Sequence, residues 1–228
     1  MVSIDTVYQK VLALANKEQR GYITPQEFNL FADQAQKDTF EQYFYDLNQF
    51  LRRPSNSDEY ADIIDNLREK IALFEKTGSI TGMNISAPGG LYRLGTVVWK
   101  GTEIEEVQQN EILYINKTPL TKPTKDRPVY VRTGELTVDI YPESIATNST
   151  SPTCTYVSIP TTPSWGYVVV QGKAMYDATN TTHFQLHSSE EGELVNKILM
   201  LAGVAIKAQD ISQAAGGLET AKQQQEKQ

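Results

Sequence analysis

The segment that begins at Pro25 constrains the fold most, because it contains no helix breaker before Pro54. As one helix it would be roughly 40 Å long, at 1.5 Å per residue. A helix that is apolar on more than one side must be covered on more than one side. Either other helices of the chain or a neighbouring subunit are therefore expected to cover it. Its apolar residues are Phe28, Leu30, Phe31, Ala32, Ala35, Phe40, Tyr43, Phe44, Tyr45, Leu47, Phe50 and Leu51.

The stretch NKEQRGYITPQEF, residues 16–28, precedes this helix and has the spacing of a calcium-binding EF-hand loop. Such a loop needs oxygen ligands at its first, third and fifth positions, but the fifth is Arg20, a permanent cation without an acceptor. A local explanation fits better. Thr24 and Glu27 have the spacing of a capping box, and Pro25 suits the first helical position. Gly21 is expected to end the preceding helix.

Three further helices are predicted from apolar spacing. The first covers residues 4–18. Another starts after Ser57 as its N-cap and ends near Gly78, and its short connection predicts an antiparallel hairpin with the long helix. The last starts after Ser188 or Ser189 as the cap and is followed by a polar, Gln-rich tail. Such a tail cannot bury enough apolar surface to order alone, although it can order on a partner.

The composition changes near residue 79, where Gly, Pro, Thr and β-branched residues become frequent. Strands are expected at 91–100, in the hairpin 129–141, and in the segments CTYVSIP and WGYVVVQGKAMYD, and GTEIEEVQQNEILYI reads as a strand leading into a short helix. We therefore predict an α+β fold with N-terminal helical hairpins, a mainly antiparallel sandwich or open barrel, and a C-terminal helix. The predicted domains are 1–78, 79–188 and 189–228.

Charge and apolar content exclude several classes of protein. The formal net charge is −7, and no basic stripe suggests a nucleic-acid groove. The first residues are amphipathic and lack the apolar core of a signal peptide. No apolar run approaches the roughly 20 residues of a membrane span. Cys154 is the single cysteine, which excludes an internal disulfide and favours a reducing compartment.

Few residues offer catalytic or metal-binding chemistry. His183 and His187 are the only histidines, and their spacing would suit zinc on a helix, but they lie in a segment that reads as a strand or loop end. Cys154 has no neighbouring base and reads as an inert, buried thiol. No glycine-rich phosphate loop is present. We expect no cofactor, no metal and no enzymatic activity.

Several blocks together resemble one family along nearly the whole chain. They are the first 50 residues, LYRLGTVVW with EIEEV, RPVYVR with LTVDIYP, YVSIPTTPSWGYV, and the C-terminal stretch from ELVNKILMLAG. In this order they resemble the virion structural proteins of tailed bacteriophages, of the head-to-tail connector or neck-ring (adaptor) type found in marine and crAss-like phages. None of these blocks is a catalytic motif.

The resemblance implies a protein of the virion neck that is present in the host cytoplasm during assembly. Such a protein docks on the portal and bridges it to the next neck or tail protein. Its copies are expected to form a ring, of twelve subunits if it matches a portal. DNA would pass through without specific binding, and an acidic chain suits that passage because like charges repel. No membrane partner is expected.

Apolar and aromatic residues in the helices and the tail are the candidates for contacts between subunits. They are Phe31, Phe40, Tyr43, Phe44, Tyr45, Phe50, Trp165, Leu194, Ile198, Ile206, Ile211 and Leu218.

Alternative functions remain open. A carbohydrate- or host-binding module of the tail would expose Trp99 or Trp165 in a groove. A hydrolase would bring carboxylates or the two histidines together in a pocket. An internal cargo protein of the virion would differ from a ring protein in its assembly rather than in its sequence.

Overall fold

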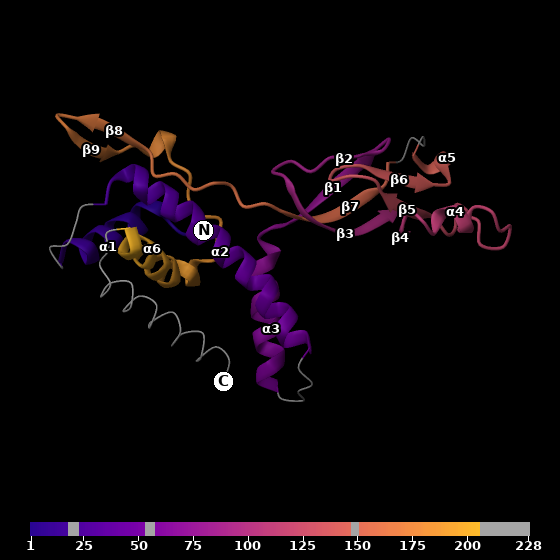
Figure 1. Ribbon diagram of the computed structural model, residues 1–228, viewed down its shortest axis with the longest axis horizontal. Coiled ribbons are helices and arrows are strands. Elements are labelled where there is room, and N and C mark those ends of the chain that lie inside the picture. The colour runs from indigo at the N-terminus through magenta and orange to yellow at the C-terminus, as the bar shows by residue number, and fades with distance from the viewer. Residues whose placement is uncertain (18–22, 53–57, 147–150, 206–228) are drawn as a thin grey trace. The chain divides into compact units, whose positions relative to one another are not determined.

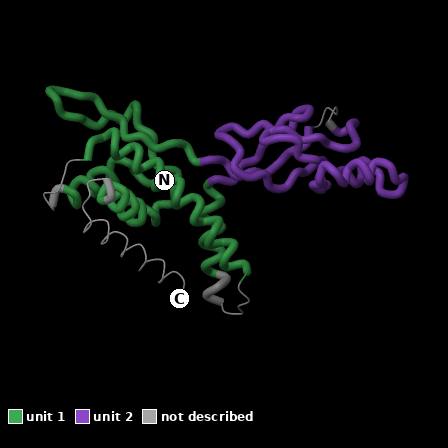
Figure 2. The backbone as a smooth tube through the Cα atoms, viewed as in Figure 1, with its two compact units in different colours: residues 1–73, 160–228 green, residues 74–159 purple. Residues whose placement is uncertain are grey.

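The computed structural model describes residues 1–17, 23–52, 58–146 and 151–205. These residues confirm the predicted α+β class, with N-terminal helices, a mostly antiparallel barrel-like sheet and a C-terminal helix (Figure 1). The chain forms two compact units, shown in different colours in Figure 2. Unit 1 contains residues 1–73 and 160–228, and unit 2 contains residues 74–159.

Unit 1 is mainly helical. Its elements are α1 (Ile4–Lys17), α2 (Pro25–Arg52), α3 (Asp58–Ala72), the strands β8 (Tyr167–Val170) and β9 (Lys173–Tyr176), the 3₁₀ turns η1 (Ala178–Asn180) and η2 (Ser188–Glu190), and α6 (Glu191–Ala205). The predicted capping box starts α2: the Thr24 amide donates to a Glu27 carboxylate oxygen at 2.9 Å. The Glu27 amide donates back to the Thr24 hydroxyl at 3.3 Å. This prediction is confirmed, whereas Gly21 lies outside the described residues.

The long helix α2 is covered on several sides by its own chain. It contacts both α3 and α6, and α1 also packs on α6. Phe28, Ala32 and Ala35 on α2 are fully buried, as are Leu194 and Ile198 on α6. The multi-sided apolar pattern of α2 is therefore explained largely by packing within unit 1.

A buried glutamine ties α2 to the segment that returns from unit 2. The Gln36 side chain donates to the Thr161 carbonyl at 2.8 Å and accepts from the Gln185 amide at 2.9 Å. The nitrogen and the oxygen of this buried side-chain amide therefore both have hydrogen-bond partners, as buried polar groups generally do. Residues 160–186 therefore belong to the helical unit.

Charged side chains of α6 and of the preceding turn η2 are held by ion pairs and by a hydrogen bond to α2. Lys197 lies 2.9 Å from Glu193 and donates to the Thr39 hydroxyl of α2 at 3.1 Å. Lys70 of α3 lies 2.7 Å from the buried carboxylate of Glu190. Breaking such a pair leaves an uncompensated buried charge, so these contacts fix the helices in one arrangement.

Unit 2 is a seven-stranded sheet with two short helices. Its elements are β1 (Glu75–Thr81), β2 (Asn84–Ile85), β3 (Leu91–Trp99), β4 (Thr102–Glu106), α4 (Ile112–Ile115), β5 (Val129–Arg132), β6 (Val138–Tyr141), α5 (Glu143–Ala146) and β7 (Thr153–Ser158). The strand order is β2-β1-β7-β3-β4-β5-β6. The Ile85 amide donates to the Leu136 carbonyl and the Val138 amide to the Met83 carbonyl, each at 2.8 Å, which joins the two ends of the sheet.

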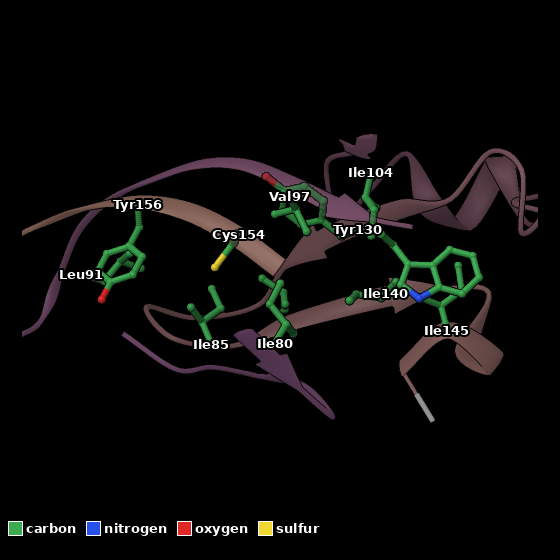
Figure 3. Packing of buried hydrophobic residues seen from close by; sticks show 12 residues of the cluster. Ile80, Ile85, Leu91, Val97, Ile104, Tyr130, Ile140, Ile145, Cys154 and Tyr156 are labelled. Carbon is green, nitrogen blue, oxygen red and sulfur yellow. The ribbon is translucent and has the colours of Figure 1, made fainter. Parts of the chain in front are cut away.

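The interior of this nearly closed sheet is one apolar core. Figure 3 shows the side chains of Ile80, Ile85 and Cys154 pointing toward a common interior. Tyr156 and Trp99 belong to the same cluster. The alternating burial of β7 follows from the two-residue period of a strand, which sends every second side chain inward.

The end of the third helix was predicted wrongly. Helix α3 ends at Ala72, and Gly78 lies inside β1 instead of ending the helix. A Cβ atom at Gly78 would lie 2.4 Å from the Ser86 carbonyl oxygen, so a glycine is needed where two backbones approach closely. Glycine was read as a helix stop, but here its lack of a side chain allows the strand pairing.

The structure divides the chain differently from the predicted domains 1–78, 79–188 and 189–228. Unit 2 ends at Ile159, and residues 160–205 pack with the N-terminal helices. The segment WGYVVVQGKAMYD forms a separate two-stranded sheet in unit 1, not a strand of the central sheet. The composition of this segment correctly predicted extended backbone. It could not predict which strand the segment pairs with, because strand pairing depends on residues that are distant in the sequence.

Candidate functional site

The β8–β9 hairpin is the most unusual surface of unit 1. Its register pairs Tyr167 with Tyr176 and Val170 with Lys173. Gln171 and Gly172 form the two-residue turn, with φ of 51° and 79°. Two positive φ angles are what a type I′ turn requires, and this turn matches the twist of a hairpin. The element is therefore well formed although it contains only two strands.

Large apolar side chains remain exposed along both strands. The exposed fractions are 52% for Val168, 61% for Val169, 47% for Val170, 57% for Met175 and 40% for Tyr176. Successive side chains of a strand point to opposite faces, so both faces of the hairpin present apolar surface. No further strand pairs with β8 or β9 among the described residues. Soluble monomers rarely leave such strands uncovered, which makes the hairpin a candidate docking element.

The base of the hairpin is held firmly by Trp165. The indole packs against Tyr8 of α1 with ring centroids 4.4 Å apart, and it stacks on Tyr167 at 5.8 Å. Its Nε1 donates to an Asp5 carboxylate oxygen at 2.9 Å. The Trp165 amide donates to the Asn29 side-chain oxygen at 2.8 Å. These contacts of Trp165 fix the base of the hairpin, which we call its root, while the strands themselves stay exposed.

The residues after β9 are fixed by Asp177. Its carboxylate accepts from the Thr179 amide at 2.9 Å and from the Asn180 side chain at 2.7 Å. These two hydrogen bonds lower the pKa of Asp177, and the bond from the Thr179 amide has the larger effect. The Asp177 amide donates to the Gly166 carbonyl at 2.9 Å, which closes the hairpin at its base.

Six of the predicted interface residues are buried inside unit 1. They are Phe40, Tyr43, Phe50, Trp165, Leu194 and Ile198. Phe31 and Phe44 are half-buried, while Tyr45 is 62% exposed. Ile206, Ile211 and Leu218 lie outside the described residues. Of the twelve residues, Tyr45 therefore has the most accessible described side chain, and the buried six contribute to the core.

Sequence reasoning missed the exposed residues of the hairpin, Val168, Val169, Val170 and Met175. The signal was present in the run VVVQGKAM, because three consecutive valines on a strand place apolar side chains on both faces. The run was predicted to be a strand of the central sheet, because a strand in that sheet has the same composition.

The two histidines accept hydrogen bonds from two different backbone amides. His183 Nδ1 accepts from the Ile4 amide at 3.3 Å, whereas His187 Nδ1 accepts from the Ser189 amide at 3.3 Å and caps η2. The predicted caps of the last helix, Ser188 and Ser189, instead lie within η2, and α6 begins at Glu191. The Ser189 hydroxyl lies 2.9 Å from the same nitrogen and donates to a Glu190 carboxylate oxygen at 3.2 Å.

Metal-binding and nucleophilic chemistry find little support in the described part of the chain. No group of three or more His, Cys, Asp or Glu side chains gathers there in a way that could hold a metal ion. Cys154 is buried in the unit 2 core, and burial raises the pKa of its thiol. Trp99 and Trp165 are both buried, so neither forms the exposed aromatic groove of a carbohydrate-binding module.

No family model matches the chain, and no curated protein matches it. Within the described ranges, no helix has the length and apolar character needed to cross a membrane.

Proposed function

We propose that this chain is a structural protein of a tailed-bacteriophage virion, a head-to-tail connector that docks on the portal and bridges it to the tail. Its copies form a ring, of twelve subunits if it matches the portal. The protein acts in the neck of the virion after passing through the host cytoplasm during assembly. DNA passes the ring without specific binding.

The observation that carries this proposal is the exposed β8–β9 hairpin on its fixed root. A protein that assembles in many copies needs surfaces that are complementary to a neighbour and are left open in the isolated chain. A contact between two different surfaces of identical subunits closes into a ring when the rotation permits. The order of sequence blocks along the chain adds the resemblance to phage neck proteins.

The test is the assembly state of the purified protein, alone and with rings of the portal protein. We expect particles of ring shape in negative-stain electron micrographs and a mass of several chains by light scattering. Val169→Asp places a charge on the hairpin and should reduce assembly, whereas Leu30→Asp makes the same change on exposed α2 surface and serves as the matched control. A strict monomer that ignores portal rings would contradict the proposal.

A further inference from the structure

A groove in unit 2 opens where two neighbouring strands separate. β3 and β4 pair from Trp99 with Thr102 to Val97 with Ile104. Beyond this point β4 pairs in parallel with β5, at Glu105 with Val129. The groove between the diverging strands has a volume of about 540 Å³ and is lined by residues 95–97, 103–106 and Tyr130.

Strand β4 presents a backbone edge to this groove. In a parallel pair, alternate residues of a strand bond to the same neighbour. The Glu105 amide donates to the Pro128 carbonyl and the Val107 amide to the Tyr130 carbonyl, so the backbone of Glu106 faces away from β5, toward the groove. On the other side, the register of β3 against β7 shifts between Leu94 and Val97. Gly95 lies in this irregularity and adds no side chain to the groove wall.

The exposed side chains that line the groove are mainly acidic, and the apolar residues beneath them belong to the unit 2 core. Val97 and Ile104 are buried, whereas Glu103, Glu105 and Glu106 are exposed. The Tyr130 hydroxyl donates to a Glu106 carboxylate oxygen at 3.1 Å. Burial, followed by the charge of Glu106, raises the pKa of Tyr130. No lining residue is basic.

We propose that this groove receives the tip of the β8–β9 hairpin from a second copy of the chain, a step that rests on the proposed ring function. The hairpin has four-residue strands that pair with no other strand in the described part of the chain, and it has apolar side chains on both faces. Residues 167–176 contain Lys173 and no acidic residue, in a chain of net charge −7. The basic tip thus complements the acidic rim.

This contact joins two different surfaces of identical chains. Pairing of a strand edge with the groove edge supplies main-chain hydrogen bonds, as in other β-augmentation interfaces. Lys173, which is exposed beside the turn, lies among the rim carboxylates and fixes the register. Since donor and acceptor differ, each copy has one of each free, and the contact propagates from subunit to subunit around a ring.

Disulfide trapping between separate variants tests the contact directly. Lys173→Cys is prepared in a tagged chain and Glu105→Cys in an untagged chain, and the mixture is oxidised. Cys154 remains in place because its thiol is buried. A mixed disulfide, resolved by mass on a non-reducing gel, can form only between two copies. Glu75→Cys, an exposed glutamate on β1, is the matched control for the acceptor, since β7 and β3 separate β1 from β4.

The expected result is a mixed disulfide with Glu105→Cys and little with Glu75→Cys. A wild-type ring without this preference would overturn the groove contact and leave the connector function intact. A predominance of Lys173→Cys homodimers would also overturn it, in favour of pairing between hairpins. Wild-type protein that stays monomeric in light scattering, both alone and with portal rings, would overturn both proposals.

A charge exchange provides an independent readout. Lys173→Glu should raise the dissociation constant of self-association about tenfold, and Glu105→Lys should act in the same direction. In the double variant the two charges are exchanged, so association should return toward the wild-type value. Additive losses without recovery would show that Lys173 and Glu105 do not face one another across the interface.

Discussion

At the scale of single residues, the capping box at the start of α2 makes a measurable contribution. Replacing Thr24 with Ala removes the hydroxyl that accepts from the Glu27 amide. The expected loss is about 1 kcal/mol in the free energy of unfolding, measured by urea denaturation. Thr24→Ser keeps an acceptor at the same place and is the control. An unchanged free energy for Thr24→Ala would show that packing alone fixes this helix start.

The same box gives this helix start a pH dependence. The Thr24 amide, followed by its hydroxyl, donates to Glu27 and lowers the pKa of that carboxyl. A folded-state pKa below the unfolded value contributes stability at pH above the ordinary pKa of 4.5. That contribution is lost as the pH falls through the lower folded pKa. Urea titrations between pH 7 and pH 3 should therefore show a smaller acid-induced loss in Glu27→Gln than in the wild type.

Replacing Gly78 with alanine and replacing Gly192 with alanine should change the stability of the protein in opposite directions. At Gly78 a Cβ would meet the Ser86 carbonyl oxygen at 2.4 Å, so β1 or its neighbour must move. We expect a destabilisation of about 1–3 kcal/mol, the usual cost of overpacking. At Gly192 in α6 a Cβ would meet nothing within 4 Å, and alanine should stabilise the helix by about 0.5–1 kcal/mol. Thermal unfolding of both variants checks the signs, and a neutral Gly78→Ala would contradict the close approach.

At the scale of elements, the hairpin depends on its tryptophan root. Trp165→Phe keeps a ring against Tyr8 but loses the Nε1 bond to Asp5, and about 1 kcal/mol of stability should be lost. Trp165→Ala also loses the packing and should cost about 3–5 kcal/mol. Chemical denaturation monitored by circular dichroism measures both. Equal losses in the two variants would assign the whole effect to the hydrogen bond, contrary to this expectation.

Elements with a strong local signal were predicted well from the sequence. The bounds of α2 follow from Pro25 and Pro54, and β3 follows from its apolar and β-branched run. Capping at Thr24 and Glu27 is confirmed because every contact is made within one helical turn. Local sequence decides such features, whatever the rest of the chain does.

The remaining features depend on contacts between distant residues. β1 was missed because Gly78 reads locally as a helix stop, while its role is set by the approach of Ser86. The hairpin was assigned to the wrong sheet because Val168 and its neighbours have the composition of a buried strand. Only the fold shows that Trp165 anchors these strands to α1 and leaves them exposed.

At the scale of the whole molecule, unit 2 is a continuous segment inserted into the helical unit. Its two ends lie side by side: Glu75 pairs with Val157, and the Ser158 amide donates to the Phe74 carbonyl at 2.9 Å. The Ser158 hydroxyl donates to the same carbonyl at 3.1 Å. An inserted unit with adjacent ends and its own apolar core has what independent folding requires.

We therefore expect a fragment of residues 74–159 to fold alone. Its circular dichroism should show β structure with a single cooperative transition, because the core residues from Ile80 to Tyr156 all lie within the fragment. A matched fragment of residues 80–152 lacks the whole of β7 and every pair that joins β1 to β7, and it should remain unfolded. Since the hairpin belongs to unit 1, the fragment should also stay monomeric. A fragment that forms rings without the hairpin would place the assembly contacts within unit 2 and rule out the hairpin as the donor.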